Sequence, residues 1–217
     1  MERSIIEKLC NIGQKEEIEL TAQFLKSKFQ ELVEKLSEKY NSQVVLLIDE
    51  YDKPIINHLG KGEEALEIGK RNREILKEFF GTIKGKNVIE RLRFVLLTGV
   101  SKFSKAGVFS ELNNLSDLTM NSKYADLLGI TEEELKKYFN YYIEEMSEGL
   151  SVDKDKLISR IMDYYNGYRF SEKNLKVINP YSLLCLFDNK KFKNYWFESG
   201  TPTFLVNLIK STNFLFA

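Results

Sequence analysis

The stretch VVLLIDE, residues 44–50, places five aliphatic residues directly before two carboxylates. Five such residues have the length and type of a strand, and strands of a parallel sheet that is covered by helices on both faces are continuously apolar. Open α/β sheets bind their ligands just beyond the carboxyl ends of the strands. The stretch therefore predicts a buried strand that presents Asp49 and Glu50 at a candidate site.

Two adjacent carboxylates at a strand end suit nucleoside triphosphate hydrolysis. The first acid can hold Mg²⁺, and the second can polarise the attacking water. Asp49 is then the candidate metal ligand and Glu50 the candidate catalytic base. The alternative is a buried strand that ends in an acidic turn, residues 50–52, before Pro54.

A second apolar run, LRFVLLT at residues 92–98, also becomes polar only at its end, in GVSK at residues 99–102. Apolar spacing predicts a helix over residues 63–80 between the two runs. A strand, helix, strand connection of this length implies a right-handed parallel crossover, so both carboxyl ends share one edge. We therefore expect Thr98 and Ser101 near the carboxylate pair, either as nucleotide-sensing hydroxyls or as capping hydroxyls at a turn.

Two further segments of the amino-terminal half carry weaker patterns. Apolar residues at steps of three and four predict a long helix over residues 18–40. Alternating apolar and polar residues predict a third, shorter strand over residues 115–120.

Beyond Gly129 the pattern becomes helical. Thr131 and Glu134 form a capping box for a helix that reaches about residue 147, and a second helix over 152–165 ends at Asn166-Gly167. Pro180 and Pro202 are each expected to open a further helix. We therefore expect an α/β domain over residues 1–129 and an all-helical domain over residues 130–217.

Composition and charge exclude several classes of function. The chain has 32 basic and 32 acidic residues, so it offers no net field toward nucleic acid or an anionic membrane. No apolar run approaches the roughly 20 residues of a membrane span, and no signal-peptide region follows Met1. The single His58 argues against a histidine-based zinc site, and Cys10 and Cys185 are expected to fill the core. We expect a cytoplasmic protein with no membrane contact and no direct binding to nucleic acid.

Four spaced motifs point to one family: LIDEYDKP at 47–54, LTGVSKFS at 97–104, YNGYRFS at 165–171, and NYW at 194–196 with SGTP at 199–202. Over residues 20–210 or so, the chain resembles the AAA-ATPase-like family of bacterial and archaeal proteins. Many of its members carry a PD-(D/E)XK nuclease-like domain after the ATPase. The resemblance implies a P-loop NTPase with a helical lid and with ATP and Mg²⁺ as cofactors.

The resemblance also implies roles for individual residues. Asp49 and Glu50 match the Walker B element, Thr98 or Ser101 resembles a sensor of the γ-phosphate, and residues 167–170 match the lid. Arg169 then has two possible roles. Its guanidinium either binds a nucleotide phosphate or anchors the lid among neighbouring tyrosines.

The chain departs from the family pattern because it contains no G-x-x-x-x-G-K-S/T sequence. In the family this phosphate-binding loop precedes the matched region, and its strand lies beside the one matched by residues 92–98. The expected fold class is therefore α/β: a partial P-loop NTPase sheet with Walker B and sensor strands but without the first strand, followed by the helical lid.

A chain without the amide nest and lysine of that loop is expected to bind ATP weakly or not at all on its own. We expect it to act as an ATPase fragment, with the missing amino-terminal P-loop segment or another protein as its partner. An exposed sheet edge leaves oligomerisation open.

Two other readings remain. The chain is alternatively a catalytically silent protein-interaction module in which the carboxylates are vestigial. In the weaker third reading, Asp49, Glu50 and Asp52 form a nuclease metal cluster, although Lys53 follows Glu50 at the wrong interval for that fold.

Overall fold

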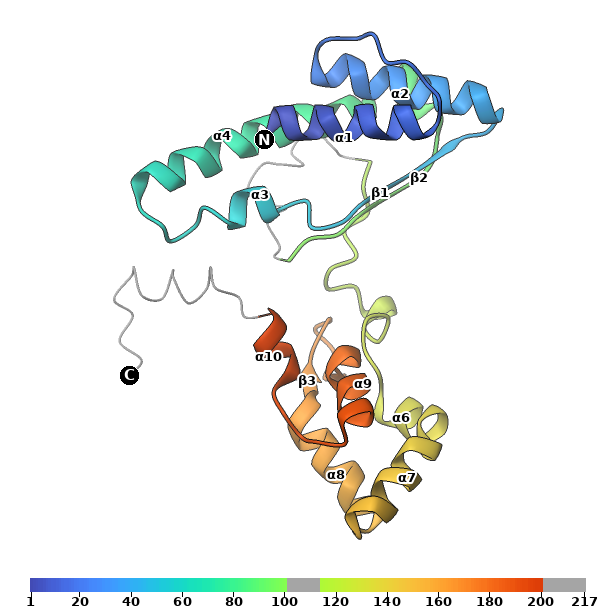
Figure 1. Ribbon diagram of the computed structural model, residues 1–217, viewed down its shortest axis with the longest axis vertical. Helices are drawn as coiled ribbons and strands as arrows, with labels where there is room; N and C mark the ends of the chain where they lie inside the picture. Colours follow the sequence, from blue (N-terminus) through green and yellow to red (C-terminus); the bar gives the residue numbers. More distant parts are fainter. Residues whose placement is uncertain (101–113, 201–217) are drawn as a thin grey trace. The chain divides into compact units, whose positions relative to one another are not determined.

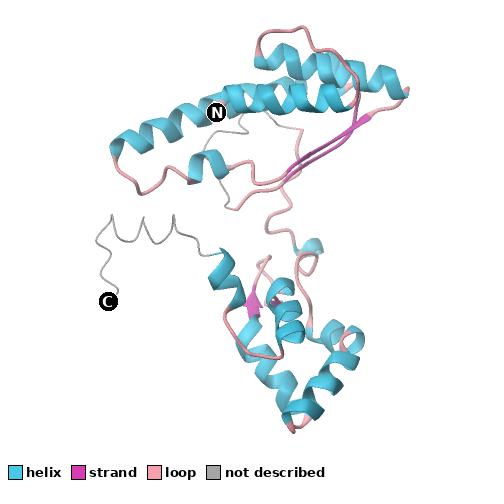
Figure 2. Cartoon of the chain, viewed as in Figure 1, coloured by secondary structure: helices cyan, strands magenta, loops and turns pink. Residues whose placement is uncertain are grey.

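The computed structural model describes residues 1–100 and 114–200, with the side chains of 198–200 left aside. This part of the chain is mostly helical (Figure 2) and divides into two compact units. The first runs from Met1 to Leu115 and the second begins at Ser116. The sequence analysis put the division after residue 129. Across the described residues, every helix is either too short or too polar to serve as a membrane span.

The first unit is an α/β unit built on a small parallel sheet. β1 and β2 pair in parallel, as predicted from the sequence, and α4 confirms the helix predicted between the two strands. The elements of the unit are α1 (Glu2–Lys15), α2 (Leu25–Tyr40), β1 (Val44–Ile48), α3 (Lys53–Ile56), α4 (Glu63–Gly81), the 3₁₀ turn η1 (Thr82–Lys84), α5 (Lys86–Ile89) and β2 (Leu92–Leu97).

Within the described residues, helices cover one face of this sheet. Alternate strand residues such as Leu46 and Val95 pack into a core with Phe29 and Phe80, and α1, α2 and α4 lie on that side of the strands (Figure 1). The other face, which we call the open face, carries large apolar side chains that are 49%, 66%, 53% and 41% exposed. These residues are Val45, Leu47, Phe94 and Leu96.

The open face corrects the expectation that both faces of the sheet are covered. A continuous apolar run is typical of a strand buried on both sides. β1 instead alternates between half-buried and exposed residues although all five are aliphatic. A continuously apolar strand therefore does not mean that helices cover both faces of the sheet within the described residues.

The predicted helix over 18–40 is wrong at its start. The chain leaves α1 through Glu17, whose φ is +54°, and Ile18 N donates to Gly13 O at 2.7 Å. A Cβ on Gly13 would lie 2.8 Å from the backbone carbonyl oxygen of Ile18, so the close approach of the two segments requires glycine. The segment up to Leu25 is therefore a connection between two helices, and α1 was missed.

The carboxylate of Glu31 on α2 holds this connection in place. It accepts hydrogen bonds from Thr21 N at 3.0 Å and Ala22 N at 2.8 Å, and it pairs with Lys35 Nζ at 2.8 Å. The Lys35 bond is the largest of the effects that lower the pKa of Glu31 from 4.5 to about 2. Because this pKa is depressed, the stability that the Glu31 carboxylate contributes is fully present above about pH 4.5 and is lost as the pH falls toward 2.

Replacing Glu31 by Gln tests this account. We expect Glu31→Gln to lower the melting temperature at pH 7 and to flatten the dependence of stability on pH between about 2 and 5, because the titrating group is gone. Thermal unfolding followed by circular dichroism at several pH values measures this. Glu64→Gln, at an exposed position in the first turn of α4, is the control, and an equal flattening there would contradict the assignment.

The second unit is mainly helical. Leu135, Ile143, Ile161 and Leu183 are fully buried at its centre. Its elements are the 3₁₀ turn η3 (Ser122–Tyr124), α6 (Glu132–Tyr138), α7 (Asn140–Leu150), α8 (Lys154–Tyr165), β3 (Asn166–Tyr168), β4 (Val177–Ile178), α9 (Pro180–Asn189) and α10 (Tyr195–Gly200).

Local sequence signals are confirmed here. The Thr131–Glu134 capping box forms in both directions, and Pro180 opens α9. The predicted helix from 131 to 147 is instead two helices that meet at Phe139, whose ring stacks on Phe187 at 5.8 Å. Pro202, expected to open a last helix, lies outside the described residues.

Two expectations for this region are wrong. The unit is not all-helical, because β3 and β4 form a short antiparallel pair after α8. The strand predicted over 115–120 is irregular chain, in which Asp117 Oδ1 accepts a hydrogen bond from Thr119 N at 3.0 Å. An alternating pattern needs a neighbouring strand to pair with, and this short Asx turn satisfies the backbone locally.

Candidate functional site

The parallel register brings Asp49 and Thr98 together at the carboxyl ends of β1 and β2. Ile48 pairs with Leu97, and the next residues continue the ladder: Thr98 N donates to Ile48 O at 2.9 Å and Tyr51 N donates to Thr98 O at 3.0 Å. The Thr98 hydroxyl donates directly to Asp49 Oδ1. Two of the residues predicted for the site are therefore in contact, although 49 positions separate them.

Glu50 lies beside Asp49 but its side chain is held by Lys53. Glu50 adopts a left-handed backbone with φ of +51°, and its N donates to Asp49 Oδ1 at 2.9 Å. Its Oε2 lies 2.6 Å from Lys53 Nζ, and this bond is the main reason that the pKa of Lys53 lies above its ordinary value. Both side chains remain about half exposed. The pair can therefore open at little cost.

Asp52 has a structural role that the sequence analysis missed. Its side chain is fully buried, and its Oδ1 accepts a hydrogen bond from Val100 N at 3.0 Å. This bond ties the loop after β1 to the loop after β2. Asp52 is also the residue directly before α3, so the sequence Asp52-Lys53-Pro54 was a helix-start signal and not only an acidic turn.

Gly99 allows this close approach of the two loops. A Cβ at this position would lie 2.6 Å from Tyr51 Cε1 and 3.0 Å from Asp52 Cγ. The glycine after Thr98 is thus required by packing against the carboxylate loop, a reason that no local pattern in the sequence reveals.

Ser101 and Arg169 are the other two residues predicted for the site. Ser101 lies outside the described residues. Arg169 belongs to the second unit, where its Nε donates to Ser171 O at 2.8 Å and its Nη2 donates to Glu172 O at 2.7 Å. These bonds fit the anchoring alternative, and a contact of Arg169 with phosphate stays a prediction.

The donors gathered at the strand ends suit a hard cation better than a transition metal. Asp49 and Thr98 offer oxygen atoms, which Mg²⁺ prefers, and Mg²⁺ is commonly held by only one or two carboxylates. Among the described residues, no group of three or more His, Cys, Asp or Glu side chains is placed to hold a metal. The nuclease-cluster reading therefore has no support from this part of the chain.

Comparison with known proteins adds a family to this geometry. Residues 1–109 match the model of the family described as predicted AAA-ATPase. The chain belongs to the predicted AAA-ATPase family. It is also 40% identical, over 184 residues, to an uncharacterized protein in the vnfD 5′ region of Azotobacter chroococcum mcd 1. That match covers 85% of this chain and 32% of the relative, so the chain spans about a third of the relative's length. No solved structure matches this AAA-ATPase family member.

The backbone of Glu50 provides a test of the local geometry. A left-handed conformation costs a residue with a Cβ about 1 kcal/mol relative to glycine. We expect Glu50→Gly to be more stable than Glu50→Ala by about that amount, because both remove the carboxylate and only one keeps the Cβ. Denaturant unfolding of the two variants measures the difference. At Glu67, which lies inside α4, the alanine variant should instead be more stable than the glycine variant.

Proposed function

We propose that this chain supplies the metal-binding and water-activating residues of an ATPase whose phosphate-binding loop lies outside these 217 residues. The observation that supports the proposal is the contact of Asp49 with Thr98 at the shared edge of two parallel strands, with Glu50 next in the chain. Family membership points to the same chemistry. The sequence contains no G-x-x-x-x-G-K-S/T motif, which is the usual phosphate-binding loop of such enzymes.

Each residue has a distinct role in the proposed reaction. Asp49 would hold Mg²⁺, which when bound neutralises charge on the phosphates. The Thr98 hydroxyl keeps one carboxylate oxygen of Asp49 in a fixed orientation. Glu50 leaves Lys53 and accepts a proton from the attacking water. Thr98, with Ser101, would report the presence of the γ-phosphate.

Among the described strands, β1 and β2 pair only with each other, so the sheet has unpaired edges as well as the open face. Both features support the idea that a further strand and helix complete the sheet and cover this face. In parallel strands, residues paired in register point to the same side, so Val45 with Phe94 and Leu47 with Leu96 form two apolar layers. Asp49 and Thr98 form the next pair along the two strands, on the side of the open face. A segment that covers the open face would therefore reach the carboxylate site as well.

The catalytic assignment is tested in the presence of a co-expressed segment made of a strand, a G-x-x-x-x-G-K-S/T loop and a helix. We expect Asp49→Ala to reduce ATP hydrolysis to background. Glu50→Gln should slow turnover by roughly 10²- to 10⁴-fold while leaving ATP affinity nearly unchanged, because only the base is lost. Steady-state phosphate release and nucleotide titration measure these effects. Unchanged turnover in both variants would refute the roles.

The completion of the sheet has its own test. Leu47 is 66% exposed on the open face, so Leu47→Ser should change the stability of the isolated chain by less than about 0.5 kcal/mol. The same variant should prevent the added segment from restoring hydrolysis. Leu46→Ser is the matched control, because this neighbour points into the helical core and its loss should cost about 2 kcal/mol. If the added segment still restores hydrolysis to the Leu47→Ser variant, the open face is not the surface that this segment contacts.

The open face also favours a second candidate function. A catalytically silent module would use these apolar side chains to bind a protein partner, and Asp49 and Glu50 would have no role in binding. A double variant with alanine at both positions separates the two functions. Partner binding that survives in the double variant, together with no hydrolysis by the parent protein under any complementation, would favour the interaction module.

A further inference from the structure

Charged residues are divided unevenly within the second unit. Residues 131–153, which include α6 and α7, contain seven acidic and two basic residues, whereas residues 154–197, from α8 onward, contain nine basic and four acidic residues. The ion pairs Lys154–Glu144 and Lys190–Glu145 join the two parts. The expectation of no binding to nucleic acid was based on the net charge of the whole chain, which conceals this basic part.

Four exposed basic side chains of this part have no carboxylate partner among the described residues. They are Lys156, Arg160, Lys191 and Lys193. Lys156 and Arg160 are one turn apart on α8, so they lie on the same face of the helix. Asp163, also exposed on α8, is the acid close to Arg160 on this helix, and its charge offsets only one of the four. The group therefore keeps a net positive charge.

Phe192 brings the lysines of the later segment to the same place as Arg160. Its ring lies under the Arg160 guanidinium, whose central carbon is 4.2 Å from the ring centroid. Lys191 and Lys193 flank Phe192 in the chain and remain exposed, while Phe192 is partly buried against the end of α8. Arg160 and the two lysines are therefore neighbours on one surface, although they come from separate parts of the chain.

Tyrosine hydroxyls hold the backbone of this segment. The Tyr165 hydroxyl donates to Lys193 O at 2.9 Å and accepts from Lys193 N at 3.2 Å, and the Tyr195 hydroxyl donates to Lys191 O at 2.7 Å. These bonds use only backbone atoms of the two lysines, so both ammonium groups stay available. Because the backbone is fixed before any ligand binds, the entropy lost on binding is smaller.

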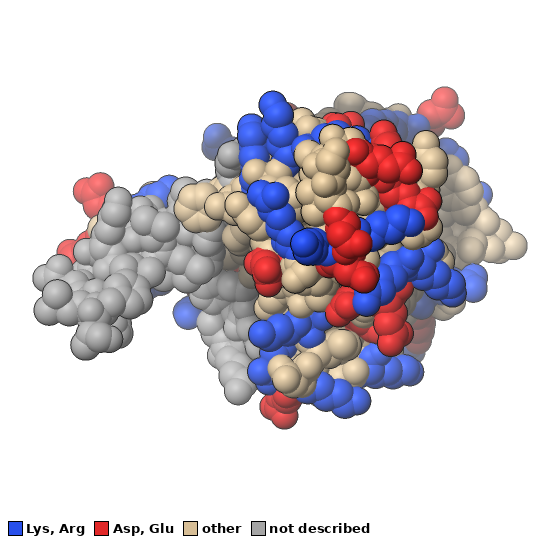
Figure 3. Space-filling model, turned by 90° about the horizontal axis from the view of Figure 1, so that it is seen from below, with Lys and Arg blue, Asp and Glu red and all other residues tan. Residues whose placement is uncertain are grey.

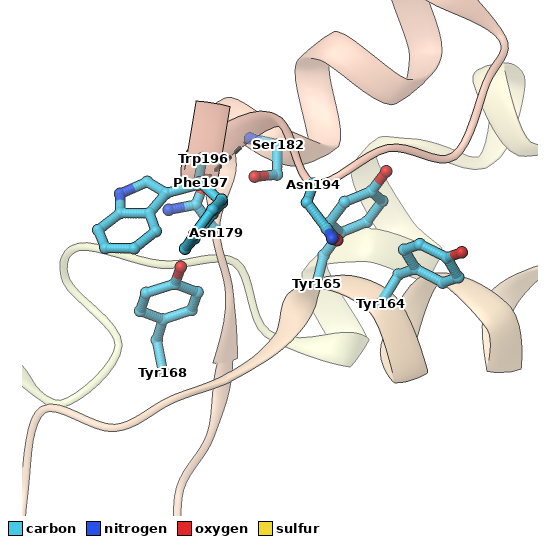
Figure 4. Close-up of a pocket in the computed structure, with 8 residues that line it drawn as sticks. All are labelled: Tyr164, Tyr165, Tyr168, Asn179, Ser182, Asn194, Trp196 and Phe197. Atoms are coloured by element: carbon cyan, nitrogen blue, oxygen red, sulfur yellow. Dashed lines mark hydrogen bonds between the residues drawn. The ribbon is translucent and has the colours of Figure 1, made fainter. Parts of the chain in front are cut away.

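An exposed aromatic ring lies beside the basic group. Tyr164 is 47% exposed, its ring centroid is 5.1 Å from that of Phe192, and Figure 4 shows it next to Tyr165 at the end of α8. Together these side chains combine cations that lack counter-ions with a ring that has free area. We call them the basic aromatic surface, which consists of Lys156, Arg160, Tyr164, Lys191, Phe192 and Lys193.

Single-stranded nucleic acid uses both kinds of group. Basic side chains contact its phosphates, aromatic rings stack on its unpaired bases, and arginine adds cation–π contact. An acidic peptide would pair with the cations but would bring no planar base to Tyr164, and a duplex keeps its bases inside the stack. We propose that the basic aromatic surface binds single-stranded nucleic acid through its phosphates and one stacked base.

A fluorescein-labelled oligothymidylate of about 12 nucleotides is the probe, a length within the range that one single-strand-binding module covers. It contains no adenine, so a site for an adenine nucleotide cannot account for its binding. We expect saturable binding to the full chain, followed by fluorescence anisotropy, with a dissociation constant of roughly 1 to 100 µM at low salt. Four phosphate contacts to a single strand predict a slope of about −3 for the logarithm of the association constant against that of salt concentration.

Substitutions separate the phosphate contacts from the stacked base. Lys191→Ala combined with Lys193→Ala should weaken binding roughly tenfold and make the salt slope shallower by about 1.4, because two phosphate contacts are lost. Tyr164→Ala should weaken binding roughly 5- to 100-fold and leave the slope unchanged, because only stacking is lost.

Matched controls remove similar groups elsewhere. Lys8→Ala combined with Lys15→Ala removes the same charge from exposed positions of α1, and Tyr141→Ala removes a ring that is 70% exposed on α7. Both should leave binding unchanged. Asp49→Ala should also leave it unchanged, and the assay needs neither ATP nor an added segment, so failure of the proposed ATPase role would not affect this test.

Three results would overturn the proposal. The first is the absence of saturable binding up to about 1 mM chain. The second is equal weakening by the surface variants and by their controls, which would mean that only overall charge matters. The third is tighter binding of an oligoglutamate peptide that Tyr164→Ala does not weaken, which would assign the surface to an acidic protein segment.

Discussion

The parallel pairing of β1 with β2 is the constraint on which the candidate site depends. Because paired residues of parallel strands point to the same side, the register fixes what each side of the sheet carries. One side supplies apolar residues to the helical core, and the other carries two exposed apolar layers followed by Asp49 and Thr98. A shift of one residue in either strand would exchange these sides and separate the carboxylate from the hydroxyl.

Within the described residues, this sheet is unusual because only one of its faces is covered by helices. Parallel sheets are normally covered on both sides, and among the described strands neither β1 nor β2 pairs with a third. The helical layer holds the covered side, while Asp52 and Gly99 hold the loops at the carboxyl ends close together. The edge geometry is therefore set within the first unit itself, before any further segment is added. Figure 3 shows basic and acidic side chains interspersed on one face of the molecule.

The sequence predicts those features that depend on residues close together in the chain. Both strands, their crossover, α4, the Thr131 capping box and the start of α9 follow from local spacing and composition. Contacts between distant residues account for the failures: Glu31 on α2 binds the backbone of the preceding connection, and a strand over 115–120 would need a partner that the described chain does not offer it. The contact of Asp49 with Thr98 was expected from topology alone, whereas the burial of Asp52 depends on a loop 48 residues away.

The carboxylates at the edge of the sheet suit a cation and the water beside a phosphate. What the sequence lacks is the loop that binds the phosphates directly, which normally contributes a large share of the affinity. A chain of this design would therefore position the phosphates of a nucleotide only after the sheet is completed. Completion of the sheet would then be the step on which hydrolysis depends, because Asp49 and Glu50 lie at the edge that the added segment would extend.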